Sequence, residues 1–409
     1  MFHRALASAT IAFGLVGVLN CSDDDAATGG TVNASQQSLL ALSATRYTPD
    51  GTSSYVALVP DLSASTAVDY GSVFDLPSEG RIWGSDKLPN TFIAVDNEAA
   101  TITKYTLDAN SQILAQGTLG FEAYGVMAFS PESHPRIDVI SAHKAYLFDA
   151  TSAQAIAFDP STMVALTAID LSGLTKDDWN LTLGESSTLL HDGQLIVFGS
   201  YADVRAERYS SELRIARIDT EADTVSYLKD ERCPASVAVQ TSSGDIYFAS
   251  GGLAAAYSRL QMDQSPQTCL LRLPSGAAKL DDFAVALADL TDGTTSGGLI
   301  PAGDDAAYVL SFDEGIMPVT EATLGSDIYG ASAWRWWRIE LGETTPGTRA
   351  TYPISTTGSA VFFEVDGQTY ANNTVSNNSE TALMRTNTDG DPEPGISIWG
   401  VLLNVVRMR

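Results

Sequence analysis

The residue types most often used for catalysis are sparse in this sequence. It contains 4 His residues, and three of them, His134, His143 and His191, stand beside Pro, Lys and Asp in segments expected to form turns. The HExxH pattern, the phosphate-binding glycine loop, the GxSxG elbow and the CxxC pair do not occur in the sequence. Exposed loop histidines are therefore favoured over a metal centre, and we expect neither a metal nor a cofactor.

Three glutamates offer the best carboxylate cluster. Glu79, Glu122 and Glu185 occur in the segments PSEGRIWG, FEAYGV and LGESS, each of which is expected to begin a structural repeat and to line a central channel. Converging carboxylates, often around a divalent cation, can support hydrolysis of an ester or a lactone. The alternative is a set of structural polar residues that hydrogen-bond around buried water.

The segment ASAWRWWRI combines arginine with several indole rings. Strand alternation puts Trp334 and Trp336 on one face and Arg335 and Trp337 on the other. Two tryptophans on one face are more typical of core packing. Arg335, with Arg338 nearby, could instead present cations beside flat aromatic surface, an arrangement that suits a planar, anionic, aromatic ligand.

Other candidate ligand-binding residues also pair cations with aromatic rings. They are Arg81, Trp83 and Tyr124, in segments that begin repeats, and Arg205, Arg208, Tyr209, Tyr257 and Arg259, in the expected loops YADVRAERYSSE and GGLAAAYSRLQ. Ordinary surface loops are the alternative for the second group, because loops carry both binding residues and variable polar residues.

The overall charge limits the class of ligand. The formal net charge is −27 at pH 7, and the basic residues are scattered. Nucleic-acid binding needs clustered Lys and Arg, so we expect no nucleic-acid partner. An anionic ligand would need a local basic or aromatic site that overrides this field.

The first residues have the features of an export signal. An apolar run follows Arg4, is too short to span a bilayer, and ends in Val18-Leu19-Asn20-Cys21. This ending resembles a bacterial lipobox, although Asn20 replaces the usual small residue, and ordinary signal-peptidase cleavage is the alternative. We expect a signal peptide at 1–20, lipidation of Cys21, a flexible acidic tether at 21–38 and a folded domain at 39–409.

Two further features refine the expected location of the chain. By resemblance to lipoprotein sorting rules, Ser22 favours the outer membrane, on either its periplasmic or its surface side. Cys233 and Cys269, the cysteines outside the lipobox, are expected to form a disulfide, with two separate buried thiols as the alternative.

The hydrophobic pattern predicts an all-β fold. Short segments rich in Val, Ile, Phe, Tyr and Thr alternate with polar turns, and strand anchors recur at Leu107, Phe158, Ile218, Leu273 and Ile339. This spacing predicts a single monomeric β-propeller of about seven four-stranded blades, with six or eight as alternatives. The apolar strand from Ile396 is expected to pair with residues 39–47 and close the ring, because closure removes exposed sheet edges. A pair of β-sandwiches is the alternative fold.

Several segments resemble one protein family. These are EGRIWG, the strand ITKYTLD at 102–108, the Tyr124-Gly125 step, the later blade pattern through WRWWRIE, and the lipobox. They resemble the MxcI-like group of siderophore-associated β-propeller lipoproteins, which are encoded beside catecholate-siderophore genes. A sister group of surface lipoproteins captures ferric siderophores for an outer-membrane receptor.

The resemblance implies a membrane-anchored lipoprotein that binds a ferric, catecholate-type siderophore for iron uptake and passes it to an outer-membrane transport receptor. It assigns no ligand residues. Two alternatives from other function classes remain, namely a cell-surface scaffold for protein interactions and a propeller hydrolase or lactonase.

Overall fold

The computed structural model describes residues 38–48, 51–77, 80–130, 135–203, 205–261, 266–303, 305–353, 355–375, 378–387 and 390–409. The predicted signal peptide, the lipidation site Cys21 and the tether up to residue 37 lie outside the described residues, as do Glu79 and His134. The sequence-based predictions for these residues therefore stay predictions. No helix in the described ranges is long and apolar enough to span a membrane.

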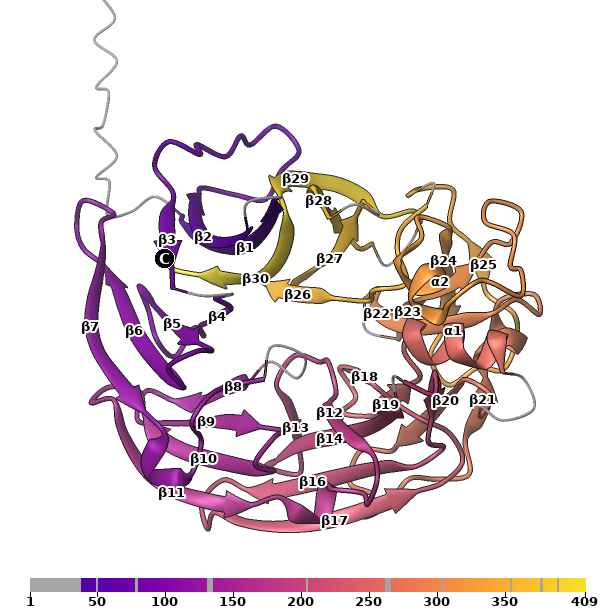
Figure 1. Cartoon of the computed structure of the whole chain (residues 1–409), viewed down its shortest axis with the longest axis horizontal. Coiled ribbons are helices and arrows are strands. Elements are labelled where there is room, and N and C mark those ends of the chain that lie inside the picture. The colour runs from indigo at the N-terminus through magenta and orange to yellow at the C-terminus, as the bar shows by residue number, and fades with distance from the viewer. Residues whose placement is uncertain are drawn as a thin grey trace, which may run out of the picture. The chain divides into compact units, whose positions relative to one another are not determined.

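Residues 38–409 form a β-propeller of seven blades (Figure 1). Strands are given from the channel outward. Blade 1 contains β30 (Val401–Arg407), β1 (Leu40–Thr48), β2 (Gly51–Val59) and β3 (Phe74–Leu76), and blade 2 contains β4 (Ile82–Trp83), β5 (Thr91–Asp96), β6 (Thr101–Leu107) and β7 (Ile113–Gly120). Blade 3 contains β8 (Arg136–Ser141), β9 (Lys144–Asp149), β10 (Gln154–Asp159) and β11 (Val164–Asp170). Blade 4 contains β12 (Asn180–Leu183), β13 (Leu189–His191), β14 (Gln194–Asp203), β15 (Arg208–Tyr209), β16 (Leu213–Asp219) and β17 (Thr224–Asp230).

The remaining three blades each have four strands. They are β18 (Val237–Gln240), β19 (Ile246–Ala249), β20 (Cys269–Leu273) and β21 (Ala284–Ala286); β22 (Ser296–Pro301), β23 (Ala306–Phe312), β24 (Trp334–Glu340) and β25 (Thr348–Arg349); and β26 (Phe362–Val365), β27 (Gln368–Thr374), β28 (Glu380–Arg385) and β29 (Glu393–Trp399). The fold class and the blade number predicted from the sequence are confirmed.

The five strand anchors identified in the sequence occupy equivalent places. Each lies in the third strand of its blade, in β6, β10, β16, β20 and β24, and each is buried. They point into the hydrophobic layers between neighbouring sheets, where burying a large apolar side chain contributes about 1.5–3 kcal/mol. The repeated pattern therefore marks the contacts between blades.

The ring closes as predicted, with one difference. β30 pairs with β1 in an antiparallel register that sets Leu40 opposite Arg407. The apolar segment from Ile396 is not one strand, because the chain turns at Gly400, whose φ is +92°. A Cβ at Gly400 would lie 2.2 Å from the Thr45 carbonyl oxygen, so glycine permits this turn. β29 consequently completes blade 7 and β30 joins blade 1.

Helices occur in the connections between strands. They are α1 (Gly252–Leu260), α2 (Gly325–Gly330), and the short 3-10 turns η2 (Glu122–Tyr124), η3 (Ser172–Leu174) and η4 (Leu287–Leu290). The expectation of a loop at 252–260 is wrong, because this segment forms α1. Its central run Ala254–Ala256 has high helix propensity, and Arg259 in the last turn complements the helix dipole.

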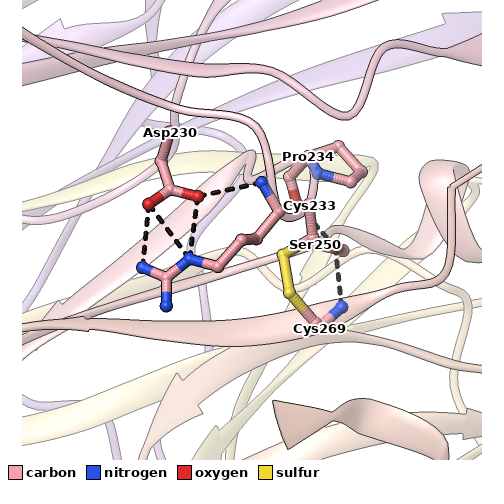
Figure 2. The surroundings of a disulfide bond; sticks show 6 residues. Asp230, Cys233, Pro234, Ser250 and Cys269 are labelled. Atoms are coloured by element: carbon pink, nitrogen blue, oxygen red, sulfur yellow. Dashed lines mark hydrogen bonds and ion pairs between the residues drawn. A yellow bond between two sulfur atoms is a disulfide. The ribbon is translucent and has the colours of Figure 1, made fainter. Parts of the chain in front are cut away.

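The predicted disulfide joins Cys233 to Cys269, with a Cα–Cα distance of 6.0 Å (Figure 2). It links the segment that precedes β18 to the first residue of β20. Ser250 Oγ donates to the Pro234 carbonyl at 2.5 Å and accepts from the Cys269 amide at 3.1 Å. This crosslink and these hydrogen bonds fasten the base of the connection that carries α1.

Candidate functional site

The innermost strand of blade 4 is interrupted in its middle. Residues 184–188 lie between β12 and β13, while the paired strand β14 has only two residues, Val197 and Phe198, across the same gap. Extra residues in one strand break the ladder and redirect side chains, and such bulges often occur beside functional sites. We call this segment the bulge 184–188.

Backbone contacts fix the bulge in place. The Gly184 amide donates to the Phe198 carbonyl at 2.8 Å, and a Cβ at Gly184 would lie 1.9 Å from the Phe198 ring. The Glu185 amide donates to Ser236 at 2.8 Å, and its carbonyl accepts from Ala238 at 3.0 Å. The bulge is therefore tied to its own blade and to blade 5, and only glycine fits at its first position.

The side chains of the bulge help to line a central cavity of about 640 Å³. The innermost strands β4, β8, β12, β26 and β30 supply most of the other walls. The charged residues in the lining are Arg81, Asp86, Arg136, Asp138, Glu185, Glu364, Asp366 and Arg407. This volume lies within the range of about 300–1,000 Å³ that is typical of small-molecule sites.

Arg136 holds the bulge from blade 3. Its Nε donates to Asp138 at 2.9 Å, while Nη1 donates to Ser186 Oγ at 2.7 Å and Nη2 to the Ser187 carbonyl at 3.0 Å. Asp138 is 3% exposed and also accepts from Thr188 Oγ1 at 2.7 Å. The charge pair is thus largely satisfied internally, which makes it a positioning network for the bulge.

Arg81 is less completely paired. Its Nη1 lies 3.8 Å from Glu185 Oε2, which is long for an ion pair, and among the described residues its buried Nε has no hydrogen-bond partner. The side chain is 19% exposed and, within the described ranges, has only this long ion pair, so the outer N–H groups of its guanidinium can donate to an oxygen atom of a ligand. Arg81 and Glu185 come from blades 2 and 4 and face each other across the cavity lining.

Glu364 is a carboxyl group of the cavity lining whose pKa is raised above the usual value for glutamate. Ser187 Oγ donates to its Oε1 at 3.3 Å. The side chain is exposed to the cavity, and the surrounding channel walls remove part of its hydration, which raises its pKa. Glu364 therefore keeps its proton to higher pH than an ordinary glutamate and can act as a donor in the cavity.

Of the three glutamates highlighted in the sequence, two lie in the described residues, and one of these two lines the cavity. Glu185 lines the cavity, Glu122 lies in η2 and is not part of the lining, and Glu79 is outside the described residues. Across the described ranges, no group of three or more His, Cys, Asp or Glu side chains could hold a metal ion. His143 is exposed and hydrogen-bonds Ser161, whereas buried His191 contacts the Ala277 carbonyl.

Several predicted ligand residues gather away from the cavity. Connections of blades 4, 5 and 6 bring together β15, α1 and α2, which we call the helical corner. Figure 1 shows α1 and α2 side by side. The Tyr209 and Tyr257 rings lie 5.8 Å apart, and Trp334 Nε1 donates to the Ile328 carbonyl at 2.8 Å. Sequence segments more than a hundred residues apart thus meet at this corner.

Near the helical corner, Arg208, Arg259 and Arg335 are each paired with a carboxylate. The pairs are Arg208–Asp203 at 3.2 Å, Arg259–Glu314 at 2.6 Å and Arg335–Asp313 at 3.2 Å. Trp334 and Trp336 are fully buried, which agrees with the core-packing alternative. Arg205 is exposed in the turn before β15. The corner is therefore well packed, and these side chains are engaged with one another.

The two remaining predicted ligand residues are Trp83 and Tyr124, and only Trp83 reaches the cavity. Trp83 lines the cavity and is 9% exposed, whereas Tyr124 lies in η2 and packs against the core between blades 2 and 3. Sequence reasoning missed Arg136, Asp138 and Glu364. The available signal was that RIDVIS and FFEV begin their blades and alternate charged with apolar residues.

No family model and no curated protein matches the sequence. A hypothetical selenium-binding protein of Sulfolobus tokodaii is similar in structure, with a TM-score of 0.56, 11% identity, and coverage of 90% of this chain and 93% of that chain. The periplasmic gluconolactonase of Pseudomonas aeruginosa is also similar, with a TM-score of 0.54, 12% identity, and coverage of 91% of this chain and 99% of that chain. For a candidate 6-phosphogluconolactonase of Bacteroides fragilis the TM-score is 0.53 and the identity 11%, with coverage of 92% of this chain and 99% of that chain. At these identities the likeness shows the propeller fold alone.

Proposed function

We propose that this protein binds a ferric siderophore in its central cavity. The observation that carries the proposal is the fixed bulge 184–188, which presents polar side chains to a cavity of about 640 Å³ together with the incompletely paired Arg81. A siderophore already fills the coordination sphere of its ferric ion, so the protein needs hydrogen-bonding groups and no metal ligands. The resemblance to siderophore-associated lipoproteins supports the same ligand class.

The charges of the cavity refine the type of siderophore. Its lining contains five carboxyl groups and three arginines, and Arg136 is already paired with Asp138 and Arg407 with Asp366. The remaining carboxyl groups, of Asp86, Glu185 and Glu364, outnumber the one remaining cation, Arg81. A highly anionic ferric tris-catecholate meets repulsion from this lining, whereas a neutral ferric tris-hydroxamate does not. We therefore favour a ligand of low net charge over the catecholate type that the resemblance implies.

We also propose that the protein is attached to the outer membrane of the cell envelope. A diacyl anchor on Cys21 would hold the propeller at the outer membrane, and a flexible tether would let it deliver its ligand to a transport receptor. Incorporation of labelled palmitate into the full chain, lost in Cys21→Ser, tests the anchor. Retention of the label in that variant would contradict it.

Calorimetric titration of the mature chain tests the ligand. We expect saturable binding of a ferric tris-hydroxamate, with weaker binding of a ferric tris-catecholate and of the iron-free forms. Equal binding of all these compounds would contradict the charge argument. A complete lack of binding would contradict the siderophore proposal.

A lactone hydrolase is the second candidate, and Glu364 is the observation that favours it. A carboxyl with a raised pKa can protonate the leaving alkoxide when water adds to the lactone carbonyl and the ring C–O bond breaks, and the proton that the added water loses then restores the carboxyl group. Arg81 could stabilise the oxyanion. Hydrolysis of a sugar lactone that is lost in Glu364→Gln and insensitive to chelator would support this activity, and wild-type rates equal to the uncatalysed rate would exclude it.

A further inference from the structure

A second, smaller cavity lies where the ring closes. Its volume is about 280 Å³, and its walls come from the end of β1, the connection before β28 and the turn at Gly400. The residues that matter for its chemistry are Arg46, Asn378 and Trp399. We call it the seam pocket. It is separate from the central cavity, because the two linings share no residue.

Trp399 gives the seam pocket a fixed aromatic wall. Its side chain is 48% exposed, yet the indole stacks on Tyr70 with ring centroids 3.9 Å apart and an interplanar angle of 7°. The Trp399 amide donates to Tyr70 Oη at 2.8 Å, and Tyr55 Oη donates to the Trp399 carbonyl at 2.5 Å. An exposed tryptophan held by this many contacts is an ordered binding surface, since little side-chain entropy is lost when a ligand docks on it.

Arg46 supplies the positive charge. Its guanidinium carbon lies 5.2 Å from the centroid of the Trp399 indole. In the described part of the chain, the lining of the seam pocket contains no carboxylate. This differs from the helical corner, where Arg208 and Arg259 are each paired with an acid. In a chain with a net charge of −27, a cation that faces an indole creates a rare local site for an anion.

We propose that the seam pocket binds a small monocyclic aromatic carboxylate. The ring packs on the exposed part of Trp399, and the carboxylate accepts hydrogen bonds from Arg46, with the side-chain amide of Asn378 available at the rim. The volume fits one ring with its substituents and is below the usual size of a site for a drug-sized ligand. This inference does not depend on siderophore binding in the central cavity.

Titration of the full-length chain with benzoate, followed by saturation-transfer NMR and calorimetry, tests the proposal. Cyclohexanecarboxylate lacks the aromatic ring and benzyl alcohol lacks the charge, so we expect both to bind at least about tenfold more weakly. Binding should also weaken as salt concentration rises. Equal affinity for benzoate and benzyl alcohol would overturn the assignment to a cationic site.

Variants locate the binding site. Arg46→Gln should weaken benzoate binding about tenfold, whereas Arg349→Gln, which changes an exposed arginine in β25, should leave it unchanged. Glu380 lies opposite Trp399 in the β28–β29 register, so Glu380→Gln should strengthen binding about twofold by removing a nearby negative charge. Unchanged binding in Arg46→Gln, or loss of binding in the cavity variant Arg81→Gln, would place the ligand elsewhere and overturn the proposal.

Discussion

Strand β24 and the bulge 184–188 differ in the regularity of their pairing. All seven residues of β24 pair with β23, from Trp334 opposite Phe312 to Glu340 opposite Ala306. The bulge, by contrast, sets five residues of an inner strand against two of β14. An unbroken ladder alternates side chains between two faces, so Trp334 and Trp336, which share one face of β24, are buried. The interrupted ladder turns polar side chains into the cavity, where they can meet a ligand.

The largest expected effect comes from removing a ring from β24. Trp334→Ala should lower the free energy of unfolding by about 3–5 kcal/mol, because it leaves a cavity in the core and removes the indole hydrogen bond to the Ile328 carbonyl. Denaturant titration measures the loss. The matched change Trp399→Ala, at a half-exposed tryptophan, should cost clearly less; an equal cost would refute the distinction between core and surface indoles.

A smaller loss of stability, combined with a loss of binding, is expected when the bulge is disturbed. Gly184→Ala drives a Cβ into the Phe198 ring and should cost about 1–3 kcal/mol while weakening ligand binding in the cavity. Gly330→Ala is the control, since a Cβ there meets nothing within 4 Å. Wild-type stability and affinity in Gly184→Ala, measured by thermal melting and calorimetry, would show that the bulge is not fixed by this contact.

The protonation of Glu364 predicts a pH dependence. Its pKa is raised above the usual 4.5 in the folded chain, so folded and unfolded forms are both protonated well below pH 4.5. As the pH rises above 4.5, the unfolded chain ionises first and wild-type stability falls relative to Glu364→Gln, until the pH passes the folded pKa. Melting curves of both proteins across this range measure the difference. A difference that does not change with pH would contradict the raised pKa.

The smallest effect should follow a change in a paired surface cation. Arg335→Gln removes the ion pair with Asp313, which is partly exposed, and should alter stability by about 0–1 kcal/mol. Siderophore affinity should stay at the wild-type value, because Arg335 lies outside the cavity lining. A marked loss of affinity in calorimetry would restore the basic-aromatic segment of β24 as the binding site.

The sequence predicted the propeller well because blade formation depends on local patterns. The anchors from Leu107 to Ile339, the seven-blade count and the pairing of the chain ends all follow from alternation and turn residues. The disulfide could also be expected, since Cys233 and Cys269 are the cysteines left in the folded domain.

The site was only partly predictable. The segments that begin blades pointed correctly to Arg81, Trp83 and Glu185 in the cavity lining. The bulge could not be foreseen, because it depends on hydrogen bonds from residue 185 to residues 236 and 238, and on the fit of Gly184 against Phe198. Likewise, the pairing of Arg259 with Glu314 is a contact between distant segments that composition does not reveal.

A paired titration decides whether the cavity beside the bulge binds the siderophore. The ferric tris-hydroxamate is titrated into the wild-type chain, Arg81→Gln and Arg335→Gln, with circular dichroism confirming that each variant is folded. We expect at least about tenfold weaker binding in Arg81→Gln and wild-type affinity in Arg335→Gln. The reverse order of affinities would contradict it and move the binding site from the cavity to blade 6.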